Sequence, residues 1–141
     1  MSIMDFSGKR VLVIGAGISG RSASEALACH GASVILNDVK NVDAQGDPWN
    51  ELKADGVQLV FGHQEAALLD NIDIVVPSPV VSPEIPIMKE AAARKLPIWS
   101  EVEVACRVTD ADILAITGTN GKTTTTTLLG EIMKAAGRET V

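Results

Sequence analysis

Short β-branched runs alternate with stretches of helical spacing along the chain, and this alternation is the feature that most restricts its fold. The runs lie at residues 10–14, 33–36, 57–61, 72–76, 97–99 and 113–116. Strands that alternate with helices assemble into a parallel sheet covered by crossover helices. We therefore predict an α/β fold, with a parallel sheet and flanking helices.

Helical spacing and turn residues mark the segments between these runs. Helices are predicted to end near His30 and to span residues 49–54, 64–70, 86–95, 101–108 and 122–136. In the first helix, Arg21, Ser24 and Glu25 are expected to face water. Because proline removes amide donors and fixes φ, the proline-rich segment 77–83 predicts a rigid loop at the carboxyl end of a strand.

Composition and charge exclude several classes of partner. The formal charge is −6, whereas binding to a nucleic-acid backbone depends on clustered Lys and Arg. No apolar stretch approaches the roughly 18 residues that cross a bilayer, and no secretory signal is found. Cys29 and Cys106 lie far apart without a CxxC motif, so we expect neither a disulfide nor a cysteine metal site. We expect a cytoplasmic protein with no nucleic-acid and no membrane partner.

A first glycine turn, Gly-Ala-Gly-Ile-Ser-Gly at residues 15–20, lies between a buried run and a helix. Gly15 allows the tight turn, Gly17 a close approach to a diphosphate, and Gly20 close packing of helix on strand. Asp38 follows roughly 20 residues on, where a carboxylate accepts a ribose hydroxyl. These features predict a nucleotide site in a Rossmann-like sheet. Two alternatives remain open, because the glycines could serve packing alone and the motif does not distinguish NAD from other nucleotides.

A second glycine turn, Gly-Thr-Asn-Gly-Lys-Thr at residues 118–123, follows an apolar run and opens a helix, as a P-loop does. It is a variant loop, because Ile116 stands where the strict pattern has glycine. The loop amides would cradle phosphates, Lys122 would supply positive charge to them, and the Thr123 hydroxyl suits Mg²⁺. Thr124 is expected to help hold phosphate. Two such turns indicate that ATP is used on a substrate that carries a nucleotide.

The quoted turns and several further segments resemble the Mur ligase family, which shares the variant loop with folylpolyglutamate synthases. These segments are VLVIGAGISGRSASEAL, LNDVK, VVPSPVVS, SEVEVA and ILAITGTNGKTTTTTLLGEIMKAAG. The resemblance covers essentially the whole chain and implies that the first turn holds UDP rather than NAD. It also implies a Rossmann-like UDP-binding domain at residues 1–110 and the start of an incomplete P-loop ATPase domain at 111–141, with its first strand, loop and helix.

The resemblance assigns expected roles residue by residue. The UDP-binding set is Gly15, Gly17, Ile18, Ser19, Gly20, Asp38, Val39, Lys40, Ser78 and Pro79. Val80 replaces the glycine that the family has after Ser78 and Pro79. The ATP-binding set is Gly118, Thr119, Asn120, Gly121, Lys122, Thr123 and Thr124, in which Lys122 and Thr123 are the catalytic residues and Thr123 is the Mg²⁺ ligand.

The activity implied by the resemblance is ATP-driven amide formation through an acyl phosphate. The chain is most similar to the members that add D-glutamate to UDP-N-acetylmuramoyl-L-alanine during peptidoglycan precursor synthesis, and such an enzyme is expected to be a monomer. These 141 residues are expected to bind UDP and to be inactive alone. The alternatives are a ligase that adds L-alanine to UDP-N-acetylmuramate and a free-standing NAD-binding regulatory module.

Overall fold

The computed structural model describes residues 4–140 of the chain. It divides into two compact units, Met1–Asp110 and Ala111–Val141, each with its own internal contacts. Among the helices of residues 4–140, none has the length and apolar character needed to cross a membrane.

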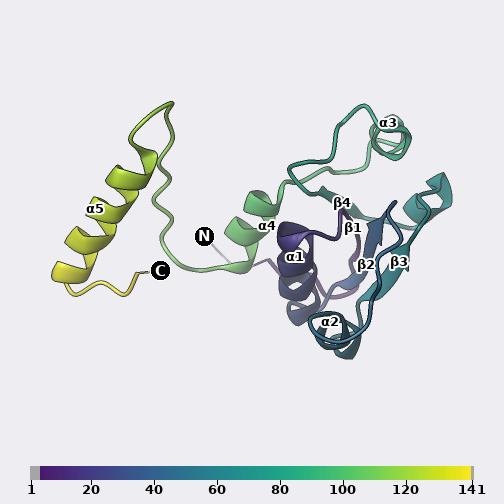
Figure 1. Cartoon of the computed structure of the whole chain (residues 1–141), viewed down its shortest axis with the longest axis horizontal. Coiled ribbons are helices and arrows are strands. Elements are labelled where there is room, and N and C mark those ends of the chain that lie inside the picture. The colour runs from purple at the N-terminus through teal and green to yellow at the C-terminus, as the bar shows by residue number, and fades with distance from the viewer. Residues whose placement is uncertain (1–3, 141) are drawn as a thin grey trace. The chain divides into compact units, whose positions relative to one another are not determined.

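The first unit contains one parallel sheet of four strands, shown in Figure 1. The strands are β1 (Arg10–Ile14), β2 (Ser33–Asp38), β3 (Gln58–Phe61) and β4 (Ile74–Pro77). They lie in the order β3-β2-β1-β4, and all three pairings are parallel. The prediction of an α/β fold with a parallel sheet is thereby confirmed. This order matches the first four strands of the doubly wound order 3-2-1-4-5-6, including the reversal between strands 1 and 4.

Side chains of β1 alternate between the two faces of the sheet, and each face has its own apolar core. Val11 and Val13 join the core that also contains Leu27 of α1, Leu52 of α2 and Val104 of α4. The elements on this face are α1 (Ile18–Cys29), α2 (Trp49–Ala54) and α4 (Glu101–Val108). Burying a Val or Leu side chain contributes about 1.5–3 kcal/mol, so this alternation fixes which face each helix covers.

The opposite face is covered by shorter elements. Leu12 and Ile14 pack there with Leu69, Ile87 and Met88. The covering elements are the single 3₁₀ turn η1 (Ala66–Leu69) and α3 (Pro86–Ala93). Sequence periodicity predicted a longer helix at residues 64–70, but only the 3₁₀ turn forms.

Two predicted strands are absent. The run at 97–99 forms only an isolated parallel bridge, between Ile98 and Val75 of β4. Its ladder ends there because Ser100 already caps α4, accepting a hydrogen bond from the Glu103 amide at 3.1 Å. The prediction of a strand at 97–99 is therefore wrong beyond this bridge.

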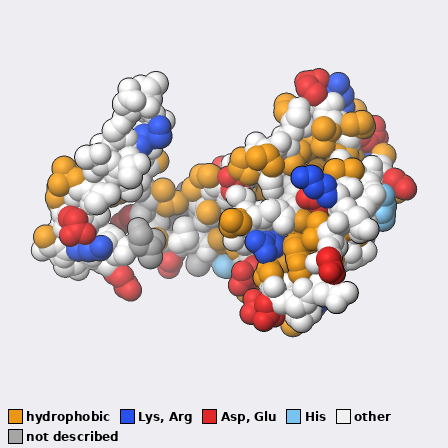
Figure 2. Space-filling view, in the orientation of Figure 1, with side chains coloured by type: hydrophobic (Ala, Val, Ile, Leu, Met, Phe, Trp, Pro, Cys, Tyr) orange, Lys and Arg blue, Asp and Glu red, His pale blue; other side chains and the backbone are white. Residues whose placement is uncertain are grey.

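The second unit contains α5 (Lys122–Ala135) and an extended segment before it. The predicted strand at residues 113–116 does not form, because residues 111–140 contain no strand that could pair with it. Ile113 and Leu114 are accordingly more than half exposed. Along α5, no residue is buried, and Leu128 and Ile132 are 60% and 54% exposed. Figure 2 shows apolar side chains on the surface of this unit.

Candidate functional site

The glycine turn lies at the point where the strand order reverses. β1 leads into the turn, and its neighbours on the two sides are β2 and β4. The Gly15 amide donates to the Asn37 carbonyl oxygen at 2.8 Å, and the Ser78 amide donates to the Ile14 carbonyl oxygen at 2.8 Å. In open parallel sheets, ligands bind outside the carboxyl ends of the strands at such a reversal point. The first glycine turn therefore meets the end of β2 and the start of the proline-rich loop. This is the edge of the sheet at which the sequence predicts a nucleotide site.

Two glycines of the turn are required by close contacts. Gly15 has φ +100°, and a Cβ there would lie 2.8 Å from the Ser78 Oγ. A Cβ on Gly20 would lie 1.8 Å from the Gly15 carbonyl oxygen. Gly17, which caps α1, has open space around its Cβ position. Packing therefore explains Gly15 and Gly20, whereas the expected approach of a diphosphate to Gly17 stays a prediction.

Asp38 holds the backbone around the turn. Its Oδ2 accepts a hydrogen bond from the Ala16 amide at 2.9 Å, and its Oδ1 accepts one from the Lys40 amide at 2.9 Å. A carboxylate oxygen can accept more than one hydrogen bond, so both oxygens keep capacity for a ligand hydroxyl. The sequence predicted a ligand contact for Asp38 and missed this positioning of the turn.

Asn37 is a fully buried polar residue for which the sequence predicted no role. Its Nδ2 donates to the carbonyl oxygens of Val60 and His63, each at 2.8 Å, and its Oδ1 accepts from Gln64 Nε2 at 2.8 Å. These bonds fasten the loop after β3 to the end of β2. The one signal in the sequence is a polar residue that interrupts an apolar run directly before Asp38.

Apolar side chains are exposed in the segments that follow three of the strands at this edge of the sheet. Ile18, Val39 and Val80 are 77%, 62% and 92% exposed, and they follow β1, β2 and β4 respectively. Ser78 is buried, and its hydroxyl donates to the Gly15 carbonyl oxygen at 3.2 Å. The Val80 side chain points into solvent.

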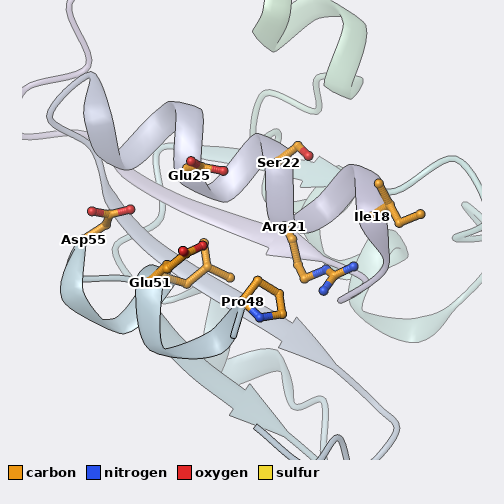
Figure 3. A pocket seen from close by; sticks show the side chains of 8 residues that line it. Ile18, Arg21, Ser22, Glu25, Pro48, Glu51 and Asp55 are labelled. Atoms are coloured by element: carbon orange, nitrogen blue, oxygen red, sulfur yellow. The ribbon is translucent and has the colours of Figure 1, made fainter. Parts of the chain in front are cut away.

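A cleft of about 220 Å³ lies between α1 and α2 beside the turn, as Figure 3 shows. Its lining residues are Ile18, Arg21, Ser22, Glu25, Pro48, Glu51, Leu52 and Asp55. Ile18 belongs to both the turn and the cleft. Ser24, which was expected to face water, is instead buried against the sheet because its hydroxyl donates to the Gly20 carbonyl oxygen at 2.7 Å.

The second glycine turn forms an exposed loop at the start of α5. Gly121 has φ +76° and caps the helix without a side-chain hydrogen bond. The Lys122 Nζ donates to the Gly118 carbonyl oxygen at 2.6 Å. A left-handed glycine at this position leaves the first amides of α5 open to an anion.

The threonine run of α5 separates into two groups. Thr126 and Thr127 donate their hydroxyls to the carbonyl oxygens of Lys122 and Thr123, each at 2.9 Å. Within residues 4–140, the hydroxyls of Thr123 and Thr124 form no such bond. Among the described residues, the Thr125 hydroxyl is likewise without a hydrogen bond, so the hydroxyls of Thr123 and Thr124 are distinguished by their place next to the loop and are open to a ligand there.

The strand order and the glycine turn at its reversal point define the first unit as a Rossmann-like α/β domain. Residues 9–100 match the Mur ligase MurD-like, N-terminal domain. The chain therefore belongs to the Mur ligase family and carries a MurD-like N-terminal domain.

Curated relatives agree with this assignment, and a solved structure shares the fold. The chain is 44% identical over 140 residues to the UDP-N-acetylmuramoylalanine-D-glutamate ligase of Syntrophus aciditrophicus (strain SB), covering 99% of this chain and 31% of the relative. It is 42% identical over 137 residues to the ligase of the same name from Shouchella clausii (strain KSM-K16), covering 97% of this chain and 30% of the relative. The murein peptide ligase Mpl of Psychrobacter arcticus has a similar fold, with a TM-score of 0.66 and 24% identity over 92% of this chain and 27% of that one.

Proposed function

We propose that the chain is the UDP-binding N-terminal part of an ATP-dependent ligase that adds D-glutamate to UDP-N-acetylmuramoyl-L-alanine. The observation that carries the proposal is the similarity, along nearly the whole chain, to ligases named for this reaction. The chain spans only 31% and 30% of these two relatives, so within these residues the proposed activity is substrate binding. The proposal includes a role in peptidoglycan precursor synthesis in the cytoplasm, and thus in cell wall biogenesis, cell shape and cell division.

The UDP group would bind at the edge of the sheet where the first glycine turn lies. The diphosphate would accept hydrogen bonds from the amides of Ile18 and Ser19 at the start of α1, beside the open position of Gly17. The uracil and ribose would lie over the end of β2, where Val39 is exposed and the Asp38 carboxylate keeps free acceptor capacity. The arrangement supports this placement because the turn is held by the sheet before any ligand binds.

The second turn suits a magnesium–nucleoside triphosphate. When bound, Mg-ATP supplies the γ-phosphoryl group that activates the substrate carboxylate. The open amides after Gly121 would hold the phosphates, and Lys122 would move its ammonium from the Gly118 carbonyl oxygen to their charge. The free hydroxyl of Thr123 would hold Mg²⁺, and that of Thr124 a phosphate oxygen.

Ligand titration of the chain tests the proposal. We expect UDP and UDP-N-acetylmuramoyl-L-alanine to bind in calorimetry, and amides of residues 15–20 to shift in NMR spectra, whereas NAD should not compete. Tight NAD binding without UDP binding would overturn the assignment in favour of a regulatory module. A clear preference for UDP-N-acetylmuramate over its L-alanyl derivative would favour the L-alanine-adding ligase instead.

A further inference from the structure

Arg21 is a cation without a counter-charge at the edge of the glycine turn. Within residues 4–140, no carboxylate forms an ion pair with it. Its Nε is buried and has no hydrogen-bond partner, and its guanidinium lies 5.4 Å from the centroid of the Trp49 ring. Packing against Trp49 therefore holds the charged group in place, while its positive charge stays unneutralised.

The contact with the Trp49 ring attracts the guanidinium but does not neutralise its charge. A partly desolvated charge without a partner costs free energy, and the positive end of a helix dipole disfavours cations. Arg21 lies one turn from the start of α1, whose first turn contains no acidic residue. An anion bound beside the turn would remove both penalties, because Arg presents several donors in a planar fork that matches phosphate oxygens.

The charges of the cleft are separated along its length. Figure 3 shows the Arg21 guanidinium directed toward the end of α1 that bears Ile18, with Glu25, Glu51 and Asp55 toward the other end. The three carboxylates would repel an anion from their end of the cleft. A phosphate-bearing ligand would therefore be drawn to the glycine-turn end.

We propose that Arg21 is a further specificity-determining residue of the nucleotide site, whose guanidinium binds a phosphate oxygen of the nucleoside diphosphate held by the glycine turn. This inference rests on the proposed function, since it takes the turn to be a UDP site. It adds a side-chain cation from the body of α1 to the backbone amides at its start.

The test measures the affinities of UDP and of uridine, which lacks phosphate, for the unaltered chain of 141 residues and for three variants. We expect Arg21→Gln to weaken UDP binding by roughly tenfold or more, as loss of a charge-assisted hydrogen bond does, while uridine binding changes less than about twofold. Arg21→Lys should recover part of the UDP affinity because it keeps the charge. Lys89→Gln makes the same change of charge on α3, where Lys89 pairs with Glu84 at 2.9 Å, and should leave both affinities unchanged.

Each outcome separates this inference from the proposed function. Equal losses for UDP and uridine in Arg21→Gln would show that Arg21 only supports the fold, and unchanged UDP affinity would show that it does not touch phosphate; either result overturns the inference. Failure of the unaltered chain to bind UDP overturns the proposed function as well. Thermal unfolding of each variant, followed by circular dichroism, verifies that the compared chains are folded.

Discussion

The Ser78 hydroxyl occupies the space that a side chain on Gly15 would need, since a Cβ there would lie 2.8 Å from Ser78 Oγ. The two residues are 63 positions apart in the chain and are joined by a hydrogen bond of 3.2 Å. The segment after β4 therefore packs against one side of the glycine turn. Substitutions around this contact should separate the packing role of each glycine from its ligand role.

Gly20→Ala should lower the free energy of unfolding by about 3 kcal/mol or more, because its Cβ would overlap the Gly15 carbonyl oxygen at 1.8 Å. Gly17→Ala is the matched control, since nothing lies within 4 Å of its Cβ position. It should cost about 1 kcal/mol or less, the effect of alanine at a helix cap, but weaken UDP binding. Urea denaturation measures the free energy of unfolding of both variants. Equal stabilities of Gly20→Ala and Gly17→Ala would contradict the packing argument.

Asp38→Asn should lower the free energy of unfolding by about 1.5–3 kcal/mol, the range for hydrogen bonds to charged groups. The carboxylate accepts from the Ala16 and Lys40 amides, and an asparagine would turn its own amide donor toward one of them. Asp43→Asn, at an exposed position of the following loop, is the control and should change stability little. A stable Asp38→Asn chain with intact amide shifts at residues 15–20 would show that the carboxylate does not hold the turn.

Asn37→Ala should cost about 2–4 kcal/mol of unfolding free energy. The substitution leaves the carbonyl oxygens of Val60 and His63 and the amide of Gln64 without their partner in a partly buried setting, and it removes the fully buried Asn37 side chain. Asn50→Ala, at an exposed position of α2, should change stability by about 0.5 kcal/mol or less. Guanidinium denaturation of both variants measures the difference between their free energies of unfolding. Equal values would show that water replaces the Asn37 hydrogen bonds and would contradict this prediction.

Hydrogen exchange should differ strongly between β1 and α5. Amides of β1 lie in a sheet with buried residues on both faces, whereas no residue of α5 is buried. Local opening needs little free energy where few apolar contacts are lost, so α5 amides should exchange much faster than those of β1. Slow exchange of α5 would mean that its apolar side chains are covered, and sedimentation would then reveal whether a second copy covers them.

Local sequence patterns predicted the sheet and the two glycine turns because these depend on side-chain alternation and on backbone freedom at single residues. Contacts between distant segments were not predictable in this way. The bond of Ser78 to Gly15 and the three bonds of Asn37 depend on which strands become neighbours. Ser24 was misplaced because its hydroxyl bonds within its own helix, which lets a polar residue face the sheet.

The structure of the run at 113–116 likewise depends on which segments are its neighbours. Its apolar, β-branched character favours a strand, but a strand forms only where another can pair with it. Residues 111–140 contain no such neighbour, and the run forms no strand, with Ile113 and Leu114 exposed. The roles assigned to Lys122 and Thr123 likewise stay predictions, since they concern a ligand.

The two hydrogen bonds of Asp38 make the shape of the turn a property of the folded sheet rather than of the bound state. The entropic cost of ordering these loops is then met during folding. Little of that cost remains to oppose ligand binding. Binding and folding of the first unit become coupled equilibria, and a ligand at the turn should raise the melting temperature of that unit with its concentration. Affinity could then be lost through substitutions deep in the sheet that touch no ligand atom.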